Sequence, residues 1–216
     1  MFDDVTVIGA GRAGSTIAAR LRERGLPVRP DAALRLICVP DRAIAEVAAS
    51  IEPGPWVAHV SGGTPLSALD PHERRFSVHP LQTLTRNGGA AQLDGAWGAV
   101  TAETAEGLER AQWLAETLGL RPFVLADDKR ALYHAGAAIA SNFLVTLYRA
   151  AEQLFDTADV PPAALIPLME RTIENGFDLT GPIARGDWET VDRHAAALDG
   201  TGLEPLYNAL AEATRP

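Results

Sequence analysis

The sequence lacks features that several classes of protein require. Its 216 residues include a single cysteine, Cys38, so no disulfide bond can form within the chain, which fits a reducing compartment. No run of 18 apolar residues is present, and the opening residues MFDDV carry two acids where a signal peptide has basic residues and then an apolar run. We therefore expect a cytoplasmic protein with no membrane partner.

Positive charge and metal-ligand patterns are also scarce. The chain has 19 lysine and arginine residues against 28 aspartate and glutamate residues, a net charge of −9. Because an acidic chain repels the phosphate backbone, we expect no nucleic-acid partner. The five histidines and the one cysteine show no metal-ligand spacing, so no metal site is predicted.

The sequence does have the pattern of a folded α/β protein. Hydrophobic residues make up 47% of the chain, which is too many for a disordered one. Strand-like runs alternate with helical periodicity at first, and only helical patterns follow residue 127. Strands are predicted at 5–8, 34–39, 56–60, 75–78, 96–101 and 122–125, and helices at 15–24, 42–51 (with Asp41 as N-cap), 104–118, 128–155, 161–175, 188–198 and 204–213. This order predicts an α/β domain with a mostly parallel sheet over residues 1–126 and an all-α domain over residues 127–216.

A glycine-rich turn joins the first predicted strand to the first helix. It reads Gly9-Ala10-Gly11-Arg12-Ala13-Gly14, which is the spacing of dinucleotide-binding loops in Rossmann-like sheets. In that arrangement Gly9 permits the tight turn, Gly11 lets the backbone approach a pyrophosphate, and Gly14 lets the helix pack on the strand. The turn predicts a binding site for NADP or NAD; the alternative is a glycine turn that serves packing alone.

The segment after the first helix is too short for a complete dinucleotide-binding domain. Such a domain has a second strand that ends in an acid about 20 residues after the loop, and Asp31 has this spacing. Only eight residues, 26–33, precede the strand at 34–39, whereas a parallel crossover needs at least about 10–12. We predict that the chain passes directly to a strand beside the first one. The usual second strand and helix, which hold the adenosine half, would then be missing, and Asp31 would be an exposed turn residue.

Polar residues at the predicted strand ends are candidates for substrate contact, because strand ends deliver residues to the ligand crevice. Ser61 and Gly62 follow one strand, and His79 follows the next. His79 can titrate near neutrality and is either a catalytic residue or a strand-end residue that bonds the backbone. His59 alternates with an apolar residue inside a strand and is predicted to be structural.

The start of the helical domain carries a second set of polar residues. Lys129 and Tyr133 are four residues apart and share a helix face, and Arg130 and His134 form the adjacent pair. Asn142 follows His134 by eight residues, so the two lie near one face. If Asn142 is buried it needs hydrogen-bond partners, and these are either the substrate or a neighbouring backbone group. Lys129 is either a site residue or part of the solvated surface.

Several segments, taken in order, resemble a known family. They are VIGAGRAG at 7–14, CVPD at 38–41, HVSG at 59–62, SVHPLQT at 77–83, YHA at 133–135, ASNF at 140–143, LTGP at 179–182 and GD at 186–187. The set resembles the Rossmann-like proteins with a DUF2520 C-terminal domain, which are similar to 6-phosphogluconate dehydrogenase-like and pyrroline-5-carboxylate reductase-like enzymes. The resemblance covers nearly the whole chain.

The resemblance implies an NAD(P)-binding domain and a helical domain that often supports a homodimer. By position, Gly9, Ala10, Gly11, Arg12, Ala13 and Gly14 would line the pyrophosphate, and Val39 and Pro40 would lie near the nicotinamide. Related dehydrogenases have a lysine and an asparagine one turn apart on the first helix of the helical domain, whereas Lys129 is followed by Tyr133. The candidate catalytic residues are His134, Asn142, His79 and Lys129, and the candidate substrate-binding residues are Ser61, Gly62, His79 and Asn142.

Three functional hypotheses follow from these observations. The first is an NAD(P)-dependent oxidoreductase acting on a small keto acid, imine or related carbonyl compound, with His134 or His79 as proton donor and Asn142 orienting the oxygen. The second is a catalytically degenerate relative that binds a nucleotide fragment or a metabolite as a sensor, which the short segment after Gly25 favours. The third is a structural dimer without a ligand.

Overall fold

The computed structural model describes residues 1–215. The chain divides into two compact units, Met1–Ser141 and Asn142–Pro216. The predicted boundary at residues 126 and 127 marks the end of the strand-containing part, whereas the division between the units lies inside the helical stretch that follows. Among the described residues, no helix is both long and apolar enough to cross a membrane.

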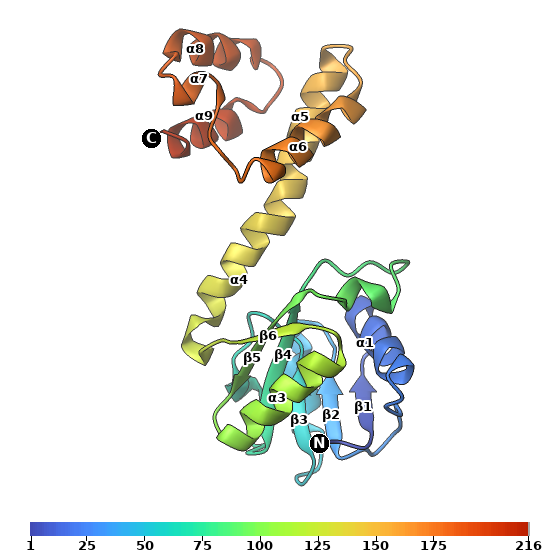
Figure 1. The fold of residues 1–216 in the computed structure, drawn as a ribbon. Helices are drawn as coiled ribbons and strands as arrows, with labels where there is room; N and C mark the ends of the chain where they lie inside the picture. Colours follow the sequence, from blue (N-terminus) through green and yellow to red (C-terminus); the bar gives the residue numbers. More distant parts are fainter. Residues whose placement is uncertain (216) are drawn as a thin grey trace. The chain divides into compact units, whose positions relative to one another are not determined.

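The first unit contains a six-stranded sheet in the order β1-β2-β3-β4-β5-β6 (Figure 1). The strands are β1 (Val5–Ile8), β2 (Leu34–Ile37), β3 (Trp56–His59), β4 (Arg75–Leu81), β5 (Trp97–Ala102) and β6 (Arg121–Val124). All neighbouring strands are parallel except the antiparallel pair β4 and β5. The predicted mostly parallel α/β sheet is therefore confirmed, and each predicted strand is present within a few residues.

The two edges of β1 show how the short segment after the first helix is accommodated. On one edge β1 pairs directly with β2, with Val5 opposite Leu34. On the other edge Val5 forms a single parallel bridge with Val28: the Val5 N–H donates to Pro27 O (3.0 Å), and the Arg29 N–H donates to Val5 O (3.0 Å). The predicted direct path to the strand at 34–39 is confirmed. One bridge stands where a complete domain has its second strand.

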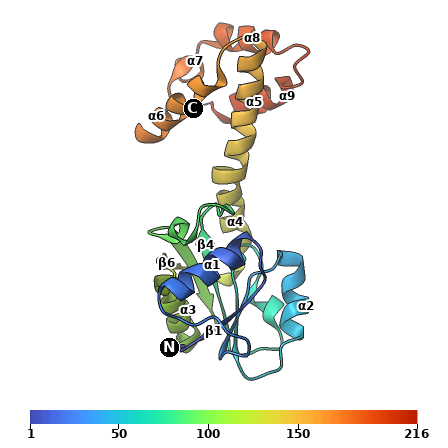
Figure 2. The same ribbon diagram turned by 90° about the vertical axis from the view of Figure 1, so that its right-hand side faces the viewer.

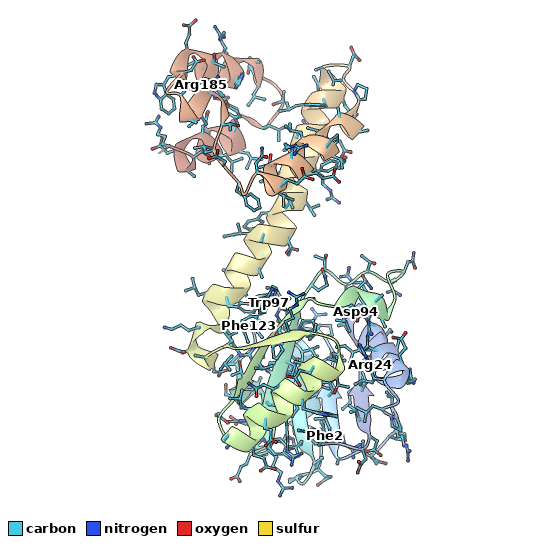
Figure 3. All side chains as sticks on the ribbon, in the orientation of Figure 1. Phe2, Arg24, Asp94, Trp97, Phe123 and Arg185 are labelled. Carbon is cyan, nitrogen blue, oxygen red and sulfur yellow. The ribbon has the colours of Figure 1, made fainter. Side chains whose placement is uncertain are left out.

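Helices cover both faces of this sheet, as the side view of Figure 2 shows. Helices α1 (Arg12–Glu23) and α3 (Ala105–Thr117) bury Ile17, Leu21, Ala111 and Leu114 in one core with β1, β2, β4 and β5. A smaller core on the other face contains α2 (Ile44–Ala49) and the 3-10 helix η2 (Leu66–Leu69). At the outer strands, the rings of Trp97 and Phe123 lie 6.3 Å apart between centroids (Figure 3).

Local sequence accounts for α3 but not for the start of α2. The Thr104 hydroxyl accepts a hydrogen bond from the Gly107 N–H at 3.0 Å, which caps the first turn of α3. Asp41, the expected N-cap of the second helix, makes no capping bond. The segment Asp41–Ala43 is instead the 3-10 helix η1, and α2 begins at Ile44. The Asp41 carboxylate is used elsewhere, as an acceptor for Ser61.

The helical stretch after β6 consists of contiguous segments of different helix types. The predicted single helix at 128–155 is the 3-10 helix η4 (Asp127–Lys129), α4 (Arg130–Ala138), the π-helical turn η5 (Ile139–Phe143) and α5 (Leu144–Thr157). The second unit continues with η6 (Pro162–Ala164), α6 (Leu165–Glu174), α7 (Gly181–Ala184), α8 (Trp188–Ala197) and α9 (Glu204–Ala213). The all-helical C-terminal part is confirmed. The turn η3 (Ala90–Leu93), between β4 and β5, completes the helical elements of the described residues.

The three glycines of the β1–α1 turn have different surroundings. Gly9 has φ +119°, a conformation that side chains rarely adopt, and a Cβ there would overlap the Cys38 carbonyl. A Cβ on Gly14 would overlap the Gly9 carbonyl oxygen. No atom lies within 4 Å of a Cβ on Gly11, so space is open in front of this residue. Gly9 and Gly14 are therefore required by the packing of the turn, whereas Gly11 is not.

Single substitutions at these glycines test which of them the packing of the turn requires. Gly14→Ala is expected to lower the free energy of unfolding by about 1–3 kcal/mol, because the obstructing atom belongs to the backbone and cannot turn aside. Gly11→Ala is expected to change it by less than about 0.5 kcal/mol, because its φ of −71° suits alanine. Chemical denaturation followed by circular dichroism measures both, and equal losses in the two variants would contradict this account of the turn.

Candidate active site

The glycine-rich turn borders a cavity of about 280 Å³ on the flank of α1. Its lining comes from the turn and α1 on one side and from the loop before η3 on the other: Ala10, Gly11, Arg12, Ser15, Thr16, Ala19, Arg86, Gly89 and Ala90. Three of the six predicted cofactor residues of the turn are thus at the cavity, and Gly9 and Gly14 pack inside the turn. Asp31 has its carboxylate 3.2 Å from the Arg35 guanidinium and is 93% exposed, as expected of a turn residue.

The end of β2 lies next to the glycine turn and is joined to the end of β3 by a hydrogen-bonded group. Val39 is close to Gly9, with its Cγ1 3.3 Å from where a Gly9 Cβ would be, and Pro40 starts the following 3-10 helix. The Ser61 hydroxyl donates to Asp41 Oδ2 at 2.8 Å and accepts from the Thr64 N–H at 3.0 Å. Ser61 is therefore an organising residue of the β3 end.

Three aromatic side chains meet at the end of β4 and the start of α4. His79 Nδ1 and the Tyr133 hydroxyl share a hydrogen bond of 2.7 Å. The His134 ring is perpendicular to that of His79, with 6.1 Å between centroids. A Cβ on Gly62 would lie 2.7 Å from His79 Cε1, and one on Gly63 would lie 3.0 Å from His134 Nδ1. The absence of side chains at these two glycines lets both imidazoles lie against the β3 end.

Arg130 holds the start of α4 against the sheet. Its side chain is 2% exposed. Its Nε donates to Asp127 Oδ1 at 2.8 Å, its Nη1 donates to the Ser61 carbonyl at 3.0 Å, and its Nη2 donates to the Ser77 hydroxyl. Asp127 also accepts from the Leu66 N–H at 3.1 Å. The guanidinium thus joins the ends of β3 and β4 to the helix that carries Tyr133 and His134.

Burial and the charge of Arg130 determine the protonation of this group. Burial, then the neighbouring His134 and Arg130 charges, lowers the pKa of His79 to about 4, against the opposing effect of Asp41. Burial is also the main reason that the pKa of His59 falls to about 3. Burial raises the pKa of Tyr133 to about 12. At neutral pH, His79 is a neutral imidazole hydrogen-bonded to a protonated phenol.

Two predicted catalytic residues lie apart from this group or outside the first unit. Lys129 is 65% exposed and pairs with Asp128 at 3.3 Å, so it is a surface residue in this structure. Asn142 belongs to the second unit, within the π-helical turn, and is exposed rather than buried as expected. His59 is fully buried, in agreement with a structural role. Within residues 1–215, no group of three or more His, Cys, Asp or Glu is arranged to hold a metal ion.

Tyr133 and Arg130 belong to this group, although the sequence does not mark them as site residues. The pairing of Arg130 with His134 along the helix was visible in the spacing, and Tyr133 was recognised only as the neighbour of Lys129. The contact that gives Tyr133 its importance is with His79, 54 positions earlier in the chain. No local pattern encodes a contact over that distance.

The lowered pKa of His79 makes stability depend on pH. The unfolded chain binds a proton at this residue near pH 6.5 and the folded chain only near pH 4, so the contribution to stability is complete above about pH 6.5 and is lost as pH falls toward 4. His79→Gln is expected to reduce the slope of unfolding free energy against pH near pH 5 by up to about 1.4 kcal/mol per pH unit.

Denaturation at pH 7, 6 and 5 measures this slope. His194→Gln is the matched control, because His194 lies exposed in α8, where its Nδ1 is 2.9 Å from the Tyr207 hydroxyl. If His79→Gln has the same slope of unfolding free energy against pH as the wild type, the lowered pKa of His79 is contradicted.

Solved structures similar to this chain have the same overall fold. BF3122 of Bacteroides fragilis, a proposed NADP oxidoreductase, aligns with a TM-score of 0.83 at 21% identity over 98% of both chains. TM1727 of Thermotoga maritima aligns with 0.75 at 25% identity over 97% of this chain and 96% of that one. A 1-pyrroline-5-carboxylate reductase of Streptococcus pyogenes aligns with 0.62 at 14% identity over 98% and 96%.

Sequence comparison places the chain in a family. No curated protein sequence matches the chain. The family model described as "Domain of unknown function (DUF2520)" matches residues 96–214, which is more than half of the 216 residues and runs from the last two strands through the second unit. The chain belongs to the DUF2520 family.

Proposed function

We propose that the protein is an NAD(P)-dependent oxidoreductase that acts on a small keto acid, imine or related carbonyl compound. The observation that carries this proposal is the joint position of two features at the carboxyl ends of the parallel strands β1 to β4. One is the glycine turn, open at Gly11, and the other is the hydrogen-bonded pair of His79 and Tyr133. Ligands of open α/β sheets bind at this edge.

The residues present fit the phosphate part of a dinucleotide. Gly11 leaves the space that a pyrophosphate needs, and the first turn of α1 offers free N–H groups and a partial positive charge. Val39 and Pro40 follow β2 beside this turn and are proposed to lie against the nicotinamide. Two of the similar structures are described as a proposed NADP oxidoreductase and a pyrroline-carboxylate reductase, which supports a nicotinamide cofactor here.

The proton chemistry is assigned to the His79–Tyr133 pair. A bound nicotinamide would supply or accept a hydride. Tyr133 keeps its proton at neutral pH and is proposed to donate it to the substrate heteroatom, while His79, kept neutral by burial, orients the phenol. His134 and Ser61–Gly62 are proposed to border the substrate.

A second candidate is a sensor that binds a nucleotide fragment or a metabolite without catalysis. The observation that favours it is the edge of β1, where a single bridge at Val28 replaces the strand that forms the adenosine wall. Such a protein would bind the phosphate part of a nucleotide and would show no turnover.

We also propose that the protein is cytoplasmic and forms a homodimer through its helical unit. Large apolar side chains are exposed on α5 and α6, where Leu144, Val145, Ile166 and Ile173 border a hollow with almost no polar surface. Apolar surface of this kind commonly marks a protein interface. A second copy of the helical unit is the proposed occupant.

Titration with NADH and NADPH tests the cofactor. We expect the wild-type protein to bind at least one of them with micromolar affinity, measured by nicotinamide fluorescence and calorimetry. Gly11→Ala places a methyl group in the open space and is expected to weaken binding at least about tenfold while the fold remains stable. No binding of either cofactor at millimolar concentration would reject the oxidoreductase.

Substitution of Tyr133 tests the proton donor. Tyr133→Phe is expected to lower kcat by about 10²- to 10⁴-fold in NAD(P)H oxidation with a panel of keto acids and imines, with an unchanged cofactor Kd. Tyr207→Phe is the matched control, because Tyr207 forms a similar pair with the exposed His194. Equal activity of Tyr133→Phe and the wild type would remove Tyr133 from the mechanism.

A further inference from the structure

The loop that connects β4 to η3 is held in one conformation by the side chain of Gln92. Its Oε1 accepts from the Thr85 N–H at 2.8 Å and from the Thr85 hydroxyl at 3.0 Å. Its Nε2 donates to the Gly89 carbonyl at 2.9 Å and to the Thr85 carbonyl at 3.2 Å. These four bonds enclose residues 85–89, which include Arg86.

Helix α1 fixes the same loop from the other side. The buried Arg20 guanidinium donates to the Ala90 carbonyl at 2.6 Å and pairs with Asp94 at 2.9 Å. Arg24, which directly follows α1, is 4.0 Å from the same carboxylate (Figure 3). The loop is thus anchored along α1, and Arg86 faces the cavity that Arg12 and Gly11 line from the other side.

The two arginines of this cavity have no acidic partner. No carboxylate of residues 1–215 lies within 4.0 Å of the Arg12 or Arg86 guanidinium, although the chain has nine more acidic than basic residues. Arg20, on the same helix, is paired. Two unpaired guanidinium groups at one cavity favour a dianion with several oxygen acceptors, because the planar fork of arginine matches phosphate geometry.

We propose that Arg12 and Arg86 bind a phosphate monoester in this cavity, in addition to the pyrophosphate held by the glycine turn. This ester has two possible sources. One is the 2′-phosphate of NADP, in which case the inference rests on the proposed function and makes the enzyme NADP-selective. The other is a phosphate group on the substrate. The usual position for a 2′-phosphate arginine is the end of the second strand, which in this chain is Arg29, beside the single bridge.

Calorimetric titration of the full chain with NADPH, NADH and glycerol 3-phosphate, with glycerol as blank, tests the proposal. The variants are Arg86→Gln and, as the matched control, Arg29→Gln; both residues are exposed, and thermal melting verifies that each variant is folded. We expect Arg86→Gln to weaken binding of the phosphate-bearing probe about tenfold to a hundredfold. Arg29→Gln is expected to bind as the wild type does.

The outcomes separate the two sources from the proposed function. Loss of NADPH but not NADH affinity in Arg86→Gln supports the 2′-phosphate, and loss of glycerol 3-phosphate alone supports a substrate phosphate. The wild-type protein could bind glycerol 3-phosphate, with affinity lost in Arg86→Gln, and bind neither dinucleotide. That result would support the phosphate site and reject the proposed function. The inference is overturned if Arg86→Gln changes no affinity, if Arg29→Gln alone removes the preference for NADPH, or if the wild type binds none of the probes.

Discussion

The rest of the site depends on the hydrogen bonds that the buried Arg130 guanidinium makes. It satisfies the Ser61 carbonyl, the Ser77 hydroxyl and the Asp127 carboxylate at once, and so joins two strand ends to the first helix after the sheet. A buried charge of this kind is tolerated only because each donor has an acceptor, and removal of one member of such a group typically costs about 3–5 kcal/mol. Its charge also helps to hold His79 and His59 neutral.

The short connection after α1 is a second constraint with consequences for binding. It leaves β1 with β2 on one edge and one bridge at Val28 on the other. The glycine turn is preserved because Gly9 and Gly14 are required by the packing of β1, β2 and α1 themselves. The adenosine wall has no such local requirement. The glycine turn can therefore keep its shape in a domain that lacks the usual second strand, and the loop around Gln92 borders the flank of α1.

The chain contains two tyrosine–histidine pairs, and their surroundings distinguish them. Tyr133 and His79 meet at the ligand edge of a parallel sheet, where burial shifts both pKa values away from neutrality in opposite directions. Tyr207 and His194 make a similar hydrogen bond on the exposed surface of the helical unit. The surroundings of the two pairs differ, because the first lies beside the buried Arg130 guanidinium and is the more strongly desolvated.

Local patterns in the sequence determined the strands, the order of the two parts, the glycine turn and the missing second strand, because each depends on periodicity or on the length of a single connection. They did not determine the start of α2, where the Asp41 carboxylate accepts from Ser61 instead of capping the helix. They also did not determine the π-helical turn between α4 and α5. Only the tertiary structure decided that His79 meets Tyr133, that Arg130 is buried while Lys129 next to it is exposed, and that Arg86 shares a cavity with Arg12. The physical reason is that contacts between distant segments depend on how the sheet places its strand ends, and no spacing along the chain records that placement.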